Sequence, residues 1–150
     1  MNLAALQRLA HRCHRRNFGL AARLLYRIAF FIFNSSVPPE VVIGAGSKFA
    51  YGGIGVVINK KAVIGENCVL GQGITIGGRG KDRPGEAVLE DGVYVGAGVR
   101  ILGPVRIGSY AIIAPNSVVL NDVEAGCIVA GIPARVIRRG ISDENQYLYV

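Results

Sequence analysis

The chain has 150 residues, of which 51% are apolar and 21 are glycine, and its formal net charge is +7. This length and composition predict one compact domain and leave no room for a second catalytic domain. The three cysteines lack disulfide-scaffold spacing or a C-x-x-C pair, so we expect no disulfide framework, no metal site and a reducing cytoplasm.

The first 36 residues are basic and amphipathic. Residues 2–33 predict one or two helices, because apolar side chains recur there at helical spacing: Leu20, Leu24, Leu25, Ile28 and Ile32, with Phe30, Phe31 and Phe33 widening the apolar side. Every acidic residue lies at or beyond Glu40, whereas six arginines precede it. A solvated helix face, packing on a trimer and contact with a membrane surface all fit this pattern.

Two other roles for this segment are disfavoured. Nucleic-acid binding is not expected, because the basic run lacks a recognition fold or stacking aromatics on strands. The apolar run between Arg27 and Asn34 is too short to span a bilayer, and no small-residue cleavage site follows it. We therefore expect no transmembrane or secreted form.

The sequence changes character at residues 35–39, where two serines and two prolines end the helical period. From there aliphatic residues recur every six positions in two series: Ile58, Ile64, Leu70 and Ile76, then Leu89, Val95, Ile101, Ile107, Ile113 and Val119. Four residues beyond these positions stand small or β-branched side chains: Ala62, Cys68, Ile74, Val93, Val99, Val105, Ala111, Ser117 and Val123. Both sets are expected to point inward.

Glycine often follows the aliphatic residue, at Gly65, Gly71, Gly77, Gly96 and Gly108, where we expect corners that use positive φ. Neither an antiparallel sandwich nor a helical solenoid has this period. The pattern predicts an all-β solenoid, a parallel β-helix of hexapeptide repeats. We assign residues 1–36 to a helical segment, 37–137 to the coil with a protruding loop at 77–88, and 138–150 to a carboxy-terminal tail.

Three motifs carry a resemblance to a known family: ITIGGRGK at 74–81, VYVGAGVRILGPVRIG at 93–108 and AGIPARVI at 130–137. They resemble the hexapeptide-repeat acyltransferases, in particular the serine acetyltransferase group and its short relatives linked to polysaccharide synthesis. The resemblance implies a left-handed β-helix, a homotrimer and acetyl-CoA bound in the groove between two subunits. By position in the motifs, the coil residues beside the pantetheine arm are Gly78, Ala97 and Pro115, and the residues placed for the CoA phosphates are Lys81 and Arg135.

The candidate bases differ from the family pattern. Family members normally use a histidine to take the proton from the acceptor hydroxyl. Short relatives commonly begin the corresponding stretch with His-Gly-Gly, whereas this chain has Tyr51-Gly52-Gly53, and the acidic partner before that histidine matches Ala50. The second family histidine matches Glu86. We therefore take Tyr51 and Glu86 as candidate catalytic residues and expect His11 and His14 to have surface or packing roles.

Three functions follow from these residues. The first is an acetyl-CoA-dependent O-acetyltransferase acting on a sugar or sugar nucleotide in cell-surface polysaccharide synthesis. The second is serine O-acetyltransferase of cysteine biosynthesis, and the third is a non-catalytic β-helix that binds CoA or a partner. For each function we expect a cytoplasmic protein. Peripheral contact with the inner membrane surface through residues 2–33 is an alternative that fits the same sequence.

Overall fold

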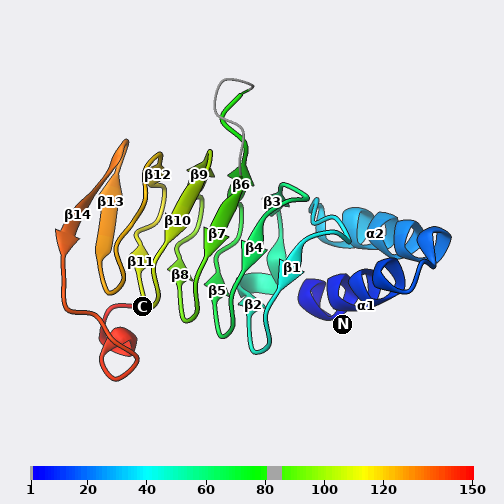
Figure 1. Ribbon diagram of the computed structural model, residues 1–150, viewed down its shortest axis with the longest axis horizontal. Helices are drawn as coiled ribbons and strands as arrows, with labels where there is room; N and C mark the ends of the chain where they lie inside the picture. Colours follow the sequence, from blue (N-terminus) through cyan, green and yellow to red (C-terminus); the bar gives the residue numbers. More distant parts are fainter. Residues whose placement is uncertain (1, 81–85) are drawn as a thin grey trace.

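Two helices precede a stack of short strands in a computed structural model that describes residues 2–80 and 86–150 (Figure 1). The helices are α1 (Leu3–Arg15) and α2 (Gly19–Phe33). Two short 3₁₀ helices follow later in the chain, η1 (Ala50–Gly53) and η2 (Gln146–Leu148). The predicted helical start is therefore confirmed, as two helices rather than one.

The strands form three sheets, which we call I, II and III. Sheet I contains β1 (Val42–Ile43), β4 (Val63–Ile64), β7 (Ala87–Leu89) and β10 (Val105–Ile107). Sheet II contains β2 (Lys48–Phe49), β5 (Val69–Leu70), β8 (Tyr94–Val95), β11 (Ile112–Ile113), β13 (Ile128–Gly131) and β14 (Ala134–Arg138). Sheet III contains β3 (Val57–Ile58), β6 (Thr75–Gly77), β9 (Arg100–Leu102) and β12 (Val118–Val119).

From β1 to β12, successive strands visit the three sheets in turn. Each strand from β1 to β9 therefore pairs with the strand three places later, and these pairs are parallel. The predicted parallel arrangement is confirmed. The last strand, β14, departs from it by turning back to pair antiparallel with β13.

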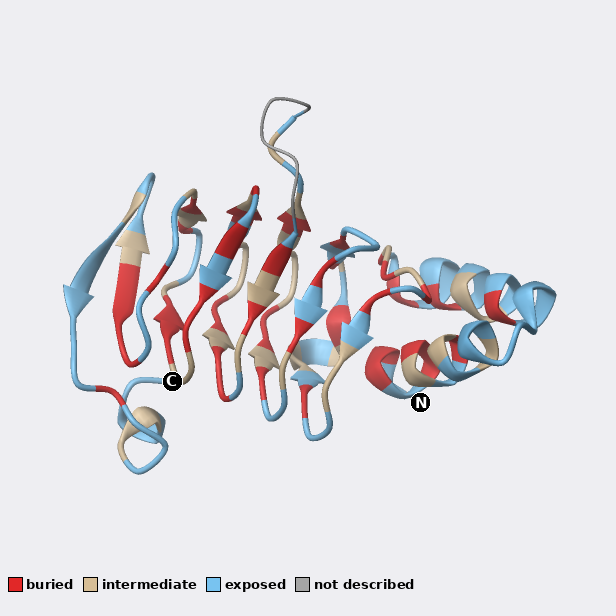
Figure 2. Cartoon of the chain, in the orientation of Figure 1, coloured by how far each residue is buried: buried red, intermediate tan, exposed pale blue. Residues whose placement is uncertain are grey.

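The core is a set of inward columns that run from coil to coil, visible as the repeated buried segments in Figure 2. Every aliphatic residue of the two six-residue series is at most 2% exposed. The second set of predicted inward residues, from Ala62 to Val123, is buried as well. Cys68 and Cys127 belong to this core, and burial raises the pKa of the Cys68 thiol, so both act as small core residues.

The glycines after the aliphatic positions serve a purpose other than the expected one. Positive φ occurs two residues later, for example at Gly73 and Gly98, and not at Gly71 or Gly96. A Cβ added at Gly71 would lie 2.6 Å from the backbone nitrogen of Ala97 on the next coil. These glycines are therefore required by the close approach of stacked backbones, which a single repeat does not reveal. Among residues 2–80 and 86–150, Gly77 has no such close backbone neighbour.

The helices close the amino-terminal end of the coil. Leu3, Leu6, Ala29 and Phe33 join the same hydrophobic core as the strands. Only part of the predicted apolar side of α2 forms this contact: Phe33 is buried together with Ala22 and Ala29, and Leu25 packs against the core, while Leu20 is 84% exposed. Small alanines allow close packing of the two helices, and because α2 is apolar on nearly all sides its sequence does not determine which side is buried.

The last residues lie against the coil at its other end. Ile141 is buried and its N–H donates to the carbonyl of Gly126. The side-chain nitrogen of Gln146 donates to the carbonyl of Gly92 at 2.6 Å. Both contacts connect the tail to corners between sheets I and II.

Candidate active site

Tyr51 lies at the corner between sheets II and III, in the first complete coil. This corner spans residues 50–56, whereas the corner above it, between β5 and β6, spans only 71–74. The additional residues form η1, in which Tyr51 has φ 50° and is 79% exposed. Within the described part of the chain its hydroxyl has no hydrogen-bond partner, so it is presented to solvent rather than packed.

The Tyr51 turn is supported from below by the helical segment. Ser35 is 1% exposed, and its hydroxyl donates to the carbonyl of Gly53 and accepts from the N–H of Val56 at 3.0 Å. A Cβ at Gly53 would lie 2.5 Å from the Leu3 side chain. The turn is thus fixed by contacts with residues outside the hexapeptide repeat.

Two of the predicted CoA-binding residues, Ala97 and Pro115, stack at this same corner on later coils. A Cβ at Gly96 would lie 2.6 Å from the nitrogen of Pro115, which places the turns after β8 and β11 in direct contact. A ladder of backbone hydrogen bonds joins the corner from coil to coil: Gly73 to Ile54, Gly98 to Gln72 and Asn116 to Ala97. Tyr51, Ala97 and Pro115 therefore lie along one edge of the prism.

Arg100 is a cation on this edge that sequence reasoning did not select. Its guanidinium donates to the carbonyls of Gly73, Gly98 and Val99. Because these carbonyls belong to successive coils, Arg100 holds the edge together. An arginine between two hexad positions gives no sequence signal for such a contact.

Gly78 and Glu86 lie at a different corner, between sheets III and I. Gly78 directly follows β6, and none of the described residues lies within 4 Å of where its Cβ would be. Glu86 directly precedes β7, and its carboxylate lies 3.8 Å from the Lys61 ammonium. Lys81 lies outside the described residues.

The segment after β6 also contains two arginines, Arg79 and Arg83, whose charge suits a phosphate group. Arg79 donates to the carbonyl of Leu120 at 3.0 Å, and its stem packs against Gly103, so it anchors the base of the loop to the coil. Arg83 lies outside the described residues. Because Arg79 is engaged with the coil, its position gives no support to a phosphate-binding role for this residue.

The described candidate residues therefore lie at three separate places on one chain. Tyr51, Ala97 and Pro115 share the edge between sheets II and III, while Gly78 and Glu86 lie across sheet III at its other edge. Arg135 is further away along the coil axis, exposed on β14, where its guanidinium donates to the carbonyl of Ala134. A single chain does not bring the two candidate bases together.

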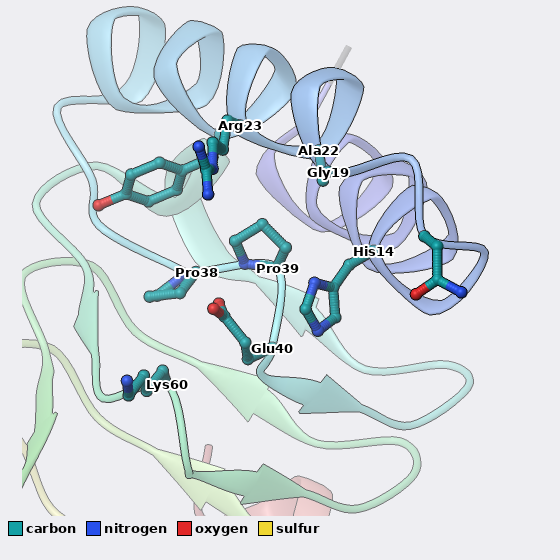
Figure 3. Close-up of a pocket in the computed structure, with 10 residues that line it drawn as sticks. His14, Gly19, Ala22, Arg23, Pro38, Pro39, Glu40 and Lys60 are labelled. Atoms are coloured by element: carbon teal, nitrogen blue, oxygen red, sulfur yellow. The ribbon is translucent and has the colours of Figure 1, made fainter.

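A cleft of about 520 Å³ lies between the helices and the first coil. Figure 3 shows His14 and Arg23 approaching Pro38 and Pro39 from the helical side, with Glu40 and Lys60 on the coil side. Among residues 2–80 and 86–150, none of the four charged or titratable side chains has a hydrogen-bond or ion-pair partner. His14 lines this cleft, whereas a ring nitrogen of His11 lies 2.7 Å from the carbonyl oxygen of Pro39, so His11 has a packing role.

No metal centre is apparent in the described part of the chain: within residues 2–80 and 86–150, no three His, Cys, Asp or Glu side chains are placed to hold an ion.

The six-residue repeat and the parallel coils define the chain as one of the hexapeptide-repeat proteins. The family described as bacterial transferase hexapeptide (six repeats) matches residues 86–121. Serine acetyltransferase of Helicobacter pylori is 38% identical over 133 residues, which are 88% of this chain and 77% of that protein. The chain therefore belongs to the serine acetyltransferase family.

Other members of the family are considerably longer than the matched region. Serine acetyltransferase of Synechococcus elongatus is also 38% identical over 133 residues, but these are only 54% of its length. The crystal structure of serine acetyltransferase from Brucella abortus in complex with coenzyme A has a TM-score of 0.86 and 33% identity, covering 93% of this chain and 56% of that one. This chain thus spans about half the length of these relatives.

Proposed function

We propose that the protein is an acetyl-CoA-dependent O-acetyltransferase. The observation that carries this proposal is the 38% identity to serine acetyltransferase of Helicobacter pylori across 88% of the chain. The coenzyme A complex of the Brucella abortus relative supports acetyl-CoA as the co-substrate. In the transfer, the acceptor oxygen bonds to the acetyl carbon, the thioester bond breaks, the acceptor proton passes to a base and CoA leaves as its thiol.

We infer further that the coil is a left-handed β-helix and that three chains form the active unit. Tyr51 and Glu86 lie on opposite edges of sheet III, so they meet only if one edge of a chain faces the other edge of its neighbour. The same groove would hold acetyl-CoA along Ala97 and Pro115, with Gly78 from the loop, and Lys81 and Arg135 at its phosphates. In this arrangement residues 37–137 form the transferase unit, residues 1–36 its helical segment and residues 138–150 its tail.

Serine is the acceptor that the comparisons favour over the sugar hydroxyl expected from the sequence. The Synechococcus, Helicobacter and Brucella relatives, each at least 33% identical to this chain, are all named serine acetyltransferases. The cleft beneath the helices suits an amino acid, because Arg23 and Lys60 offer cations to a carboxylate and Glu40 offers a carboxylate to an ammonium group. We include this cleft in the proposal as the candidate acceptor pocket.

A sugar hydroxyl remains the second candidate for one specific reason. Both histidines of the chain precede the coil, and Tyr51 stands at the position where the family pattern has its histidine. A changed base is a reason to expect a changed acceptor. Polysaccharide synthesis belongs to this second candidate. For either acceptor the proposal includes a cytoplasmic location and contact with the inner membrane surface through residues 2–33.

The test is CoA thiol release by the purified protein with acetyl-CoA and, separately, L-serine, nucleotide sugars and oligosaccharides. Release with serine supports the first acceptor and release only with a sugar supports the second. Cofactor binding without release on any acceptor would leave the non-catalytic reading. Tyr51→Phe and Glu86→Gln should each lower the rate strongly without changing the thermal midpoint, and an unchanged rate removes that residue from the mechanism.

Mixed assemblies test whether two chains build the site. If Tyr51 and Glu86 act across an interface, refolding Tyr51→Phe chains with Glu86→Gln chains restores both residues at about a quarter of the sites, because a cyclic assembly pairs unlike surfaces. If both residues act within one chain, the mixture is no more active than the two variants alone. Each variant refolded by itself is the control.

A further inference from the structure

The outward face of α2 is apolar and uncovered. Four side chains at intervals of four, four and three residues form one stripe along it: Leu20, Leu24, Ile28 and Phe31, which are 84%, 60%, 37% and 81% exposed. The opposite face, which packs against the rest of the chain, contains Ala22 and Ala29. A helix that is apolar on both sides is expected to have a second surface to cover it.

The position of the helix leaves this face accessible. Figure 1 shows α1 and α2 side by side beyond the first coil, projecting away from the strands, and Figure 2 shows most of α2 exposed. Further exposed apolar residues, Phe18 and Ile32, are found at or near the two ends of the helix, at 62% and 55% exposure. The uncovered surface thus extends over the whole length of α2.

The charge around the stripe is entirely positive. Residues 2–39 contain six arginines and no acidic residue. Arg8 donates to the carbonyls of Gly44 and Ser47, and Arg23 lines the cleft, while the other four are exposed outside the cleft: Arg12, Arg15, Arg16 and Arg27. Apolar side chains bordered by long cationic ones are typical of a helix lying in the interface of an anionic bilayer.

The same charges disfavour a second copy of the hairpin as the covering partner. Two hairpins meeting face to face would bring together eight arginines, four from each copy, without an acidic residue in either hairpin to pair with them. A bilayer-spanning position is also unsuitable, because none of the described helices is long and apolar enough to cross a membrane. A helix in the plane of a lipid surface meets both conditions.

We propose that the outward face of α2 docks on an anionic lipid surface, with its stripe among the acyl chains and the surrounding arginines at the headgroups. This inference rests on the membrane contact in the proposed function and specifies its surface, but it is independent of acetyl transfer. Docking in this way places the helical end of the molecule on the membrane and leaves the coil in water.

The experiment is co-sedimentation of the full chain with vesicles of phosphatidylcholine alone or of phosphatidylcholine with phosphatidylglycerol. We expect binding only to the anionic vesicles and its loss in high salt. Leu20→Gln/Phe31→Gln should weaken binding at least tenfold, and Arg16→Gln/Arg27→Gln should also weaken it. The matched control is Tyr147→Gln/Leu148→Gln, which changes two exposed residues of the tail, 70% and 63% exposed, and should bind as the unmodified protein does.

Light scattering and thermal melting are measured on the same samples. An unchanged oligomeric state and thermal midpoint in the Leu20/Phe31 variant, together with lost vesicle binding, support the proposal. No binding by the unmodified protein, equal binding to neutral vesicles, or full binding by the variant would overturn it. A variant that loses its oligomeric state would also overturn it, since a second copy would then cover the face. Thiol release, assayed without lipid, reports on the proposed enzyme separately.

Discussion

Ser35→Ala should destabilise the protein far more than its size suggests. The Ser35 hydroxyl bonds to three backbone groups in a site that is 1% exposed: the carbonyls of Phe33 and Gly53 and the N–H of Val56. Phe33 keeps a second donor, the N–H of Gly55. The substitution therefore leaves one donor and one acceptor buried without a partner.

The magnitude follows from those two groups. A buried unsatisfied backbone group costs about 1–3 kcal/mol, so the loss of partners for two such groups should lower the free energy of unfolding by about 2–6 kcal/mol. Urea unfolding followed by circular dichroism measures this difference. Ser142→Ala is the matched control, because Ser142 is exposed and its hydroxyl has no bond within the described residues; its effect should stay within about 0.5 kcal/mol.

The same variant tests whether the Tyr51 turn depends on the helical segment. Since Ser35 holds both Gly53 and Val56, its loss should lower kcat and leave the KM for acetyl-CoA nearly unchanged, as expected of a positioning residue. A free energy within about 0.5 kcal/mol of the Ser142→Ala value would refute the reasoning, because the two groups would then have found other partners.

Three further predictions concern the coil and its end. Gly96→Ala should cost about 1–3 kcal/mol, because its Cβ would lie 2.6 Å from the nitrogen of Pro115, whereas Gly78→Ala should unfold like the parent in urea. The hydroxyl of Ser109, and to a smaller extent Arg106, lower the pKa of the Glu90 carboxyl below its ordinary value of 4.5. Glu90 therefore stabilises the folded protein above pH 4.5, and this stabilisation is lost as acid protonates the carboxylate. The difference in the free energy of unfolding between the parent and Glu90→Gln should narrow as the pH falls. Arg8→Met should cost about 1–3 kcal/mol in the same denaturation assay, and an effect no larger than that of Arg15→Met would contradict its capping role.

The six-residue period located the core because a β-helix repeats its side-chain directions at that interval. The inward columns from Ile58 to Val119 follow from it without any long-range information. The period did not explain Gly71 and Gly96, since the obstruction at each is the backbone of the next coil, more than fifteen residues away in the chain. The local pattern predicts whether a side chain points inward, whereas the distance between stacked backbones depends on the assembled coil.

The candidate site was only partly predictable. Tyr51 came from the resemblance to a family motif, and the structure adds that its turn is exposed and three-dimensionally separate from Glu86. The cleft around Glu40 has no sequence signature, because His14, Arg23 and Lys60 come from three elements and become neighbours only when the helices fold onto the coil. For the same reason the contact of Ser35 with Gly53 was not foreseen.

The two ends of the coil are closed in different ways, and neither follows the repeat. A stack of parallel strands leaves unpaired backbone groups at both ends, which would recruit another chain if left open. At the start, Gln7, Arg8 and His11 bond to carbonyls of the segment from Pro39 to Ser47. At the finish, β14 turns back on β13 and the tail follows it. The Tyr51 turn rests on the helical cap at the start of the coil. The residues that position this candidate base, Leu3 and Ser35, therefore lie outside the hexapeptide repeat and have no signature in its period.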